Sequence, residues 1–275
     1  MSETADQELS GVAETSLIAL YLRAMESQRP DGLTKDEKAV ALIARLAPAD
    51  VDRIKRFPMS DLNIASVIRR SLELDRQARA FLARHPAAAV VHMGCGLDMR
   101  FERVDNGRVE WYDLDLPDVI ALRRKLIGDE AGRYHLMGTS LLEEAWLDAV
   151  SAHRPLLFLA EGLLMYLHEA DVKWLVRTLR GRFPGAELAF DAFNPFHVWT
   201  NSMLFERKKI GAPLHWGIWR GQELEGWGDG IRLLDEWGWL DQPEPRVASL
   251  RRLRCIPLVG RVMRIYHYRL GEAAG

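Results

Sequence analysis

Cysteine and long apolar runs are scarce in this 275-residue sequence. The two cysteines, Cys95 and Cys255, are too few and too far apart for a disulfide framework or a Cys-x-x-Cys metal site. They indicate a reducing compartment. No apolar run approaches the roughly 20 residues that a bilayer-spanning helix needs, and residues 1–10 lack the basic start and apolar stretch of a secretory signal. We therefore expect a cytoplasmic protein with no membrane contact and no metal site.

The sequence also lacks a block of charge of one sign. Its 37 basic and 39 acidic side chains are interspersed and give a formal net charge of −2. Nucleic-acid-binding proteins concentrate Lys and Arg on one surface, so this pattern argues against a nucleic-acid partner. With 48% hydrophobic residues, the chain can bury a large core. A small-molecule partner fits this composition better, and the sequence leaves the oligomeric state open.

The spacing of apolar residues divides the chain into a helical part and an α/β part. In residues 1–86 apolar side chains recur three and four positions apart, which predicts a helical cap. From residue 87 to residue 193, short apolar runs alternate with helical stretches, as in a parallel sheet with crossover helices. Strands are expected at about 88–93, 109–114, 133–137, 155–160 and 186–191, and helices near 117–127, 143–151 and 169–182.

Residues 194–245 interrupt this alternation and are rich in tryptophan, which predicts a helical lid insertion. Residues 246–275 then predict an antiparallel hairpin, with strands at about 246–254 and 262–270 and a connection through Pro257 and Gly260. The expected fold class is α/β. We expect a single Rossmann-like domain with a seven-stranded, mainly parallel sheet, the N-terminal helical extension, the lid and the C-terminal hairpin.

A Gly-x-Gly turn follows the first expected strand, at Gly94 and Gly96. Glycine lets a ligand approach the backbone of such a turn, because a Cβ atom would block the approach and resist unusual dihedral angles. Dinucleotide-binding enzymes extend the pattern to GxGxxG, but Met99 stands at the third position. The turn favours a mononucleoside ligand, with a purely structural turn as the alternative. His92, inside the preceding strand, is expected to be a hydrogen-bonded core residue.

Acidic residues end two further strands of this pattern. Asp113 and Asp115 follow the glycine turn by about twenty residues, where a carboxylate can accept two hydrogen bonds from the cis-diol of a ribose. Residues two apart on a strand face the same side, so either aspartate is a candidate. One of them is alternatively the cap of the helix that begins near Pro117. Glu161 follows the strand at 155–160, at the edge where open α/β sheets bind ligands.

These motifs resemble those of the leucine carboxyl methyltransferases and the related bacterial polyketide O-methyltransferases. The segment VVHMGCGLDMRFERVD is similar to the family's strand and turn, two apolar residues and then N/x-L-G-A/C-G-L/M-D-T-R. WYDLDLP resembles its E-V-D-F/L-P segment, and LAEGLLMYL resembles A-E-G-V-L-x-Y-L. With an upstream helical arginine followed by a Phe-Leu pair, the resemblance covers about residues 60–195. It implies a methyltransferase that uses S-adenosylmethionine as its cofactor.

The resemblance assigns cofactor roles to individual residues. It implies that Arg70 holds the methionine carboxylate, that Gly94 lines the turn together with Gly96, that Asp115 binds ribose and that Glu161 lies near the cofactor. Arg70 is alternatively a solvated arginine on an amphipathic helix.

The sequence departs from the family's motifs at two positions. Ser140 and Leu141 stand where the family has an Asp-Leu pair, so the carboxylate expected beside adenine is replaced by a hydroxyl that can still form a hydrogen bond. We keep both residues in the predicted cofactor site. Met99 replaces the usual threonine. The missing carboxylate is the feature that most favours a catalytically silent binding protein.

The acceptor site is defined by fewer signals. His197 and His215, in the insertion, are candidate general bases, with a surface or packing role as the alternative. Tyr166, Trp199 and Trp216 are candidate contacts for an aromatic or polyketide-like acceptor, and each is alternatively a packing residue.

We therefore expect an O-methyltransferase acting on a carboxylate or phenolic hydroxyl of a small, polyketide-like acceptor. A carboxylate is ionised at neutral pH and needs no general base, whereas a phenol benefits from one. The alternatives are a protein C-terminal carboxyl methyltransferase, a nucleotide-binding oxidoreductase, and a silent binding protein that keeps the fold.

Overall fold

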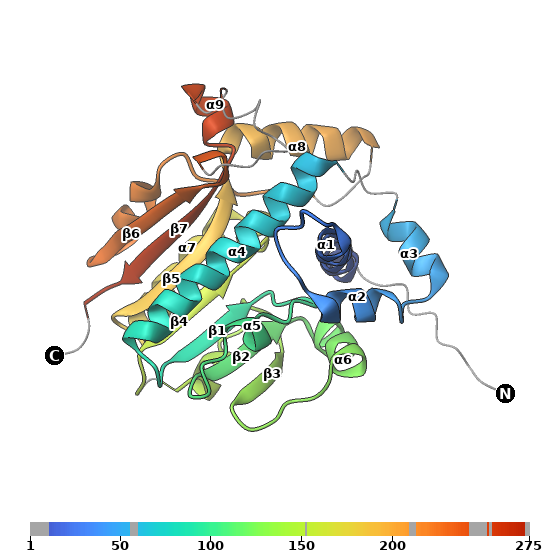
Figure 1. The fold of residues 1–275 in the computed structure, drawn as a ribbon. Coiled ribbons are helices and arrows are strands. Elements are labelled where there is room, and N and C mark those ends of the chain that lie inside the picture. Colours follow the sequence, from blue (N-terminus) through green and yellow to red (C-terminus); the bar gives the residue numbers. More distant parts are fainter. Residues whose placement is uncertain are drawn as a thin grey trace.

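The computed structural model describes residues 11–55, 60–151, 153–208, 213–241, 252 and 255–272. Within these residues the strands form a seven-stranded sheet in the order β3-β2-β1-β4-β5-β7-β6 (Figure 1). The strands are β1 (Ala89–Met93), β2 (Glu110–Asp115), β3 (Tyr134–Gly138), β4 (Leu156–Ala160), β5 (Ala186–Phe193), β6 (Ile231–Gly238) and β7 (Met263–Leu270).

Most of the sheet is parallel. Parallel pairs join β3, β2, β1, β4 and β5, whereas β7 is antiparallel to both β5 and β6. The strand order reverses between β1 and β4, which are paired along their whole length. In open α/β sheets this reversal leaves a crevice at the carboxyl ends of the strands, and ligands bind there.

Helices lie on both faces of the sheet and over its carboxyl edge. They are α1 (Gly11–Gln28), α2 (Glu37–Ile43), α3 (Pro48–Ile54), α4 (Asp61–Arg84), α5 (Arg100–Val104), α6 (Pro117–Leu126), α7 (Glu169–Arg182), α8 (Pro195–Lys208) and α9 (Pro257–Gly260). Short 3-10 helices are η1 (Ala145–Ala149), η2 (Leu164–Tyr166), η3 (Gly221–Trp227) and η4 (Trp239–Asp241). In Figure 1, α4 crosses the sheet diagonally while α1, α2 and α3 gather beside it.

The alternation of side chains along β1 explains why both faces are covered. Val90 packs with Leu74 and Phe81 of α4 on one face, and Val91 packs with Val172 and Leu175 of α7 on the other. Every residue of β1 is buried, as expected for a central parallel strand with helices on both sides. The sheet is therefore a rigid base for whatever lies at its carboxyl ends.

Local signals set the ends of the helices that approach this edge. The hydroxyl of Ser60 accepts a hydrogen bond from the backbone N–H of Asn63, which caps α4. Asp36 caps α2 in the same way through the N–H of Ala39. Pro117 occupies the first turn of α6, where its missing N–H costs nothing.

The parallel core is confirmed, with each predicted strand within about three residues of its observed ends. The partner of the last strand differs from the prediction. Most of the strand expected at 246–254 lies outside the described residues, and the strand that pairs with β7 on its outer side is β6, inside the segment interpreted as a helical lid. The residues expected to connect the hairpin, Pro257 and Gly260, form α9.

The reason for this difference is the irregular apolar pattern of β6. Its exposure does not alternate cleanly, and its register with β7 shifts between Leu233 and Asp235. An edge strand with a bulge gives no two-residue periodicity to read.

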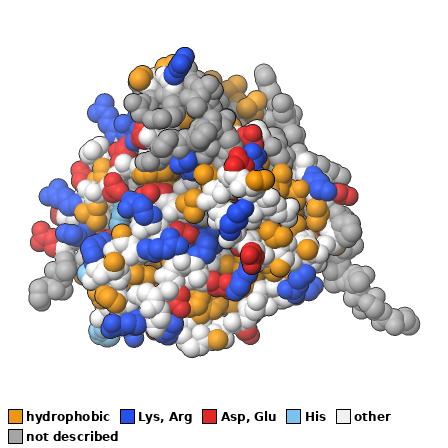
Figure 2. Space-filling view, in the orientation of Figure 1, with side chains coloured by type: hydrophobic (Ala, Val, Ile, Leu, Met, Phe, Trp, Pro, Cys, Tyr) orange, Lys and Arg blue, Asp and Glu red, His pale blue; other side chains and the backbone are white. Residues whose placement is uncertain are grey.

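Two further features concern the surface and the helices. Figure 2 shows side chains of both charges across one face of the molecule, with hydrophobic side chains between them. In the part of the chain that the structure describes, none of the helices combines the length and the apolar character needed to cross a bilayer.

Candidate active site

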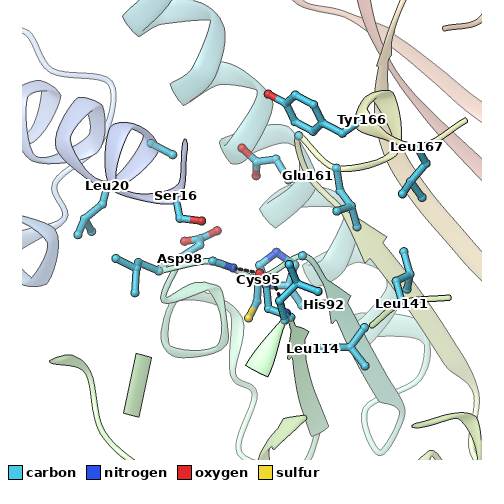
Figure 3. A pocket seen from close by; sticks show the side chains of 18 of the residues that line it. Ser16, Leu20, His92, Cys95, Asp98, Leu114, Leu141, Glu161, Tyr166 and Leu167 are labelled. Carbon is cyan, nitrogen blue, oxygen red and sulfur yellow. Dashed lines mark hydrogen bonds between the residues drawn. The ribbon is translucent and has the colours of Figure 1, made fainter. Parts of the chain in front are cut away.

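A cavity of about 360 Å³ opens at the carboxyl ends of β1, β2 and β4 (Figure 3). Its walls come from α1, α4, the turn after β1, the residues that follow β3, and the segment from Glu161 to Leu167. Small-molecule pockets have volumes of about 300–1,000 Å³. The cavity therefore has both the size and the position of a ligand site in an open α/β sheet.

The glycine turn forms the floor of the cavity next to β1. Gly94 and Gly96 have φ angles of 65° and 51°, which L residues with a side chain rarely adopt. A Cβ atom on Gly96 would lie 2.7 Å from the Ser16 hydroxyl oxygen, and one on Gly94 would lie 2.9 Å from a methyl carbon of Leu163. The missing side chains thus keep the space between the turn and its neighbours open.

Asp115 lies at the cavity, directly beside this turn. Its Oδ2 accepts a hydrogen bond of 2.7 Å from the N–H of Gly96, and its Oδ1 accepts one of 2.8 Å from Leu116. Burial raises the pKa of Asp115 above its ordinary value. Each carboxylate oxygen keeps lone-pair capacity for a further donor, such as a ribose hydroxyl.

Asp113 is placed elsewhere, which corrects its inclusion among the predicted cofactor contacts. Its side chain is fully buried, 2.5 Å from Arg123 Nη2, and its Oδ1 accepts a hydrogen bond of 2.8 Å from Trp111 Nε1. Asp113 does not belong to the described residues that line the cavity. The two aspartates share a face of β2, but only Asp115, the last residue of the strand, reaches the edge.

Arg70 and Glu161 come together although they are 91 residues apart. Arg70 Nε donates to Glu161 Oε1 at 3.1 Å, and its Nη1 donates to Asp191 Oδ2 at 3.0 Å. Both residues line the cavity, so Arg70 is not a solvated surface arginine. Asp191, within β5, also accepts a hydrogen bond of 2.6 Å from the N–H of Gly162. It was not predicted from the sequence.

Glu161 is held in its ionised form. Burial alone would raise the pKa of Glu161, but the guanidinium groups of Arg100 and Arg70 outweigh it and keep the pKa below the usual value. Arg100 is completely buried. Its Nη2 donates to Glu161 Oε2, and its Nε donates to Asp75 Oδ1 at 2.7 Å. A carboxylate with this pKa is a poor general base at neutral pH.

Two further charged residues of the cavity were missed in the sequence analysis. Arg23 of α1 lies 3.2 Å from Asp36 and 3.7 Å from Asp98, and both Arg23 and Asp98 line the cavity. Asp98 is also bound by Arg103 at 2.6 Å. For Asp98 the available signal was the Asp98-Met99-Arg100 sequence directly after the glycine turn, because it belongs to the quoted family motif.

Ser140 and Leu141 line the cavity beyond the end of β3. The hydroxyl oxygen of Ser140 accepts a hydrogen bond of 3.2 Å from the N–H of Leu142. The side chain of Leu141 is buried among core residues. The structure therefore brings both residues to the cavity despite the lost carboxylate.

The predicted acceptor contacts separate into different environments. Tyr166 lines the cavity (Figure 3), and burial raises its pKa, so its hydroxyl stays protonated and can donate a hydrogen bond. Trp216 is a core residue whose ring centroid lies 5.8 Å from that of Phe190. Trp199 is 58% exposed on α8. Of these three, Tyr166 alone belongs to the described cavity lining.

The two candidate bases also lie outside that described lining. His197 stacks on Phe193 with ring centroids 4.4 Å apart, and burial lowers its pKa. The ring of His215 lies 4.3 Å from that of His168. The structure therefore gives both histidines packing contacts and does not bring them to the cavity.

Comparison with known proteins places this fold and cavity in context. The family model described as leucine carboxyl methyltransferase matches residues 16–180. The tetracenomycin polyketide synthesis O-methyltransferase TcmP of Streptomyces glaucescens is 38% identical over 244 residues, 88% of each chain. The S-adenosyl-L-methionine-dependent methyltransferase dpfgK of Gibberella zeae is 30% identical, over 82% of this chain and 81% of its own.

Among solved structures, the fold is similar to that of a candidate methyltransferase from Thermobifida fusca. The TM-score is 0.57 at 15% sequence identity, and the match covers 95% of this chain and 94% of that one. The sheet and the relatives together define an S-adenosylmethionine-dependent methyltransferase. More specifically, the chain belongs to the leucine carboxyl methyltransferase family.

The charges that line the cavity fit this cofactor. Two arginines and three carboxylates line it within the described residues, a formal balance of −1, and they are Arg23, Arg70, Asp98, Asp115 and Glu161. S-adenosylmethionine carries an ammonium, a carboxylate and a sulfonium group, so its net charge is +1. On this basis the residues that would hold it are Asp115 for the ribose and the Arg70–Glu161 pair for the charged amino-acid end.

Proposed function

We propose that this protein transfers a methyl group to an oxygen atom of a small, polyketide-like acceptor, and that the oxygen belongs to a carboxylate. The observation that carries the proposal is the 38% identity to a polyketide O-methyltransferase over 88% of both chains. A relationship of that extent includes the acceptor side of the molecule as well as the cofactor motifs.

The preference for a carboxylate rests on the bonding of the titratable groups in the cavity. Glu161 accepts from two arginines, Asp115 accepts from two backbone N–H groups, and Asp98 is bound by Arg103. Each of these carboxylates is thus already engaged by the protein. His92, which also lines the cavity, is bonded to Arg100 and Asp113. A phenol with a pKa near 10 would need a base, whereas a carboxylate reaches the site ionised.

These contacts assign a separate role to each group of residues in the cavity. Bound S-adenosylmethionine supplies a methyl group that is already activated by its sulfonium sulfur. The Asp115–Gly96 pair orients the nucleoside end, and the ion pair of Arg70 with Glu161 orients the amino-acid end. Tyr166 donates its phenolic hydrogen to the acceptor and fixes its approach, while Leu163 and Leu167 exclude water. Alignment and exclusion of water are the main tasks left to the protein.

The test is an assay with S-adenosylmethionine labelled in the methyl group and three acceptors. They are an aromatic polyketide acid, the same compound with its carboxyl group reduced to an alcohol while its phenols are kept, and a short peptide ending in leucine. We expect label in the acid alone. The product should release labelled methanol in mild alkali, because a methyl ester hydrolyses there and an aryl methyl ether does not.

Other outcomes would assign a different acceptor. Alkali-stable label in both the acid and the reduced compound would identify a phenol as the acceptor and overturn the preference for a carboxylate. Label in the peptide alone would favour a protein C-terminal carboxyl methyltransferase. S-adenosylhomocysteine bound with no transfer to any acceptor would favour a silent binding protein.

A further inference from the structure

Two buried polar residues close to the glycine turn have no part in the function described so far. His92 is 1% exposed and Asp113 is 0% exposed, on neighbouring strands β1 and β2 that pair them directly. His92 Nδ1 lies 3.3 Å from Asp113 Oδ1. Burying a polar group costs free energy unless it is hydrogen-bonded. The hydrogen-bond partners of these two residues therefore indicate their role.

His92 is joined on its other side to the residue that holds Glu161. Arg100 Nη1 lies 3.0 Å from His92 Nε2. Arginine carries only donors, so this ring nitrogen must accept, and the ring proton must lie on Nδ1 and point to Asp113. The same guanidinium donates from Nη2 to Glu161 Oε2. His92 is therefore neutral and has a defined tautomer between a donor and an acceptor.

Asp113 is joined on its other side to the glycine turn. Its Oδ2 lies 2.5 Å from Arg123 Nη2 and accepts a hydrogen bond of 2.7 Å from the Tyr134 hydroxyl. Arg123 Nη1 in turn donates to the carbonyl oxygen of Gly96 at 3.0 Å. Burial alone would raise the pKa of Asp113, but Arg123, His92 and Trp111 outweigh it and lower the pKa, so the carboxylate stays ionised.

These contacts form one continuous buried chain from one side of the cofactor site to the other. It runs from the Gly96 carbonyl through Arg123, Asp113, His92 and Arg100 to the Glu161 carboxylate. Gly96 and Glu161 follow different strands, and both line the cavity. The connection crosses β1 and β2 through buried side chains, so solvent does not compete for its hydrogen bonds.

We propose that His92 and Asp113 are positioning residues for S-adenosylmethionine: through Arg100 and Arg123 they fix the Glu161 carboxylate and the Gly96 turn at one separation. The inference rests on the proposed placement of the cofactor and not on the choice of acceptor. Asp113 lies outside the described cavity lining and His92 borders it, and the role proposed for both is to act through the two arginines. Breaking this series of hydrogen bonds is expected to weaken cofactor binding by more than the accompanying loss of folding stability explains.

The test uses two substitutions that each keep one half of the histidine's function. In His92→Gln the side-chain carbonyl reaches the position of Nε2 and accepts from Arg100. In His92→Asn the shorter amide donates to Asp113 but leaves Arg100 without its acceptor. The binding of S-adenosylhomocysteine is measured by calorimetry together with the thermal unfolding midpoint. His267→Gln and His267→Asn are matched controls, because His267 is a buried histidine of β7, 2.8 Å from Glu187.

We expect His92→Gln to bind S-adenosylhomocysteine within about threefold of the wild type and His92→Asn to bind about tenfold more weakly. Both control variants should bind like the wild type. Equal affinities of the two His92 variants, or affinities that follow only the unfolding midpoint across all four variants, would overturn the proposal. Absence of binding to the wild type would instead overturn the cofactor placement on which the proposal rests.

A second measurement does not depend on any variant. Nitrogen-15 NMR of the wild-type protein labelled at histidine is expected to show one neutral ring protonated at Nδ1, with a shift of the Nε2 signal when S-adenosylhomocysteine binds. Protonation of His92 at Nε2 in the neutral ring would exclude the hydrogen bond from Arg100 and overturn the proposal.

Discussion

The backbone N–H of Gly96 donates a hydrogen bond of 2.7 Å to Asp115 Oδ2. This bond ties the turn after β1 to the end of β2, so the two strand ends form one preformed surface at the cavity. Residues far apart in the sequence reach the same cavity in this way, and the following predictions test what each contributes.

Replacing Asp115 with alanine is expected to weaken binding of S-adenosylhomocysteine by about 10- to 100-fold, since hydrogen bonds to a charged group contribute about 1.5–3 kcal/mol. Calorimetric titration measures the effect. Asp129→Ala, which removes an exposed aspartate paired with Arg124, is the matched control and should leave the affinity unchanged. Equal binding by both variants would contradict the assignment of Asp115.

Gly96→Ala is expected to abolish detectable cofactor binding and lower the unfolding midpoint, because the new methyl group would lie 2.7 Å from Ser16 Oγ as well as requiring a positive φ. Gly107 has a φ of +79° but no atom within 4 Å of its Cβ position. Gly107→Ala therefore carries only the backbone strain, of about 1 kcal/mol. If the two variants have the same cofactor affinity and the same unfolding midpoint, close contact with α1 is not the reason that residue 96 must be glycine.

Tyr166→Phe is expected to raise the KM for the acceptor about fivefold while the affinity for S-adenosylhomocysteine stays the same. The change removes only the hydroxyl, and a neutral hydrogen bond contributes about 1 kcal/mol. Steady-state kinetics at saturating cofactor separate the two effects. A lower affinity for S-adenosylhomocysteine with an unchanged KM for the acceptor would mean that Tyr166 contacts the cofactor instead of the acceptor.

Trp216→Ala is expected to lower the free energy of unfolding by about 3–5 kcal/mol, as for other large buried aromatic residues. The side chain is 4% exposed and packs between Phe190 and Trp227. Urea unfolding measures the loss. Trp199→Ala, at a side chain that is 58% exposed, should change stability by less than about 0.5 kcal/mol. Similar losses at both positions would contradict the core role of Trp216.

Glu187 gives a pH dependence of stability. Burial alone would raise its pKa, but His267 and Arg84 outweigh it and lower the pKa to about 2, below the ordinary value of 4.5. The carboxylate thus stabilises the folded state above pH 4.5, and this contribution is lost as the pH falls from about 4.5 to 2. Glu187→Gln should lower the free energy of unfolding by about 1 kcal/mol at pH 7.

This deficit should shrink as the pH falls through that range. Urea unfolding of both proteins at pH 7, 5, 4 and 3 follows the difference. A deficit that stays constant over the series would mean that the ionisation of Glu187 does not stabilise the fold.

The class of fold could be predicted because its signals are local. The apolar run that became β4 is continuous, and the runs that became β1 and β5 are interrupted by only one and two polar residues, since strands covered on both faces need no polar side. The glycine turn and Pro117 mark the ends of elements at the right positions. β6 was not predicted as a strand, because an edge strand with a shifted register has no regular period.

The site could be predicted only in part, for a related reason. Gly94, Gly96, Asp115 and Glu161 stand at strand ends, and the topology of a parallel sheet brings such residues to one edge. Asp113 was misplaced because spacing gives the face of a strand but not the depth below its end.

The sequence by itself determined the class of protein, the cofactor and the edge of the sheet at which the cavity lies, since composition, the alternation of strands and helices, and short motifs are local features. Only the tertiary structure decided the partners of the charges. Arg23, Asp191 and Arg100 come from separate segments, and their ion pairs join residues up to 121 positions apart. The packing of α1 and α4 over the sheet creates those contacts, because it buries the charges and leaves each one to be compensated by its neighbours.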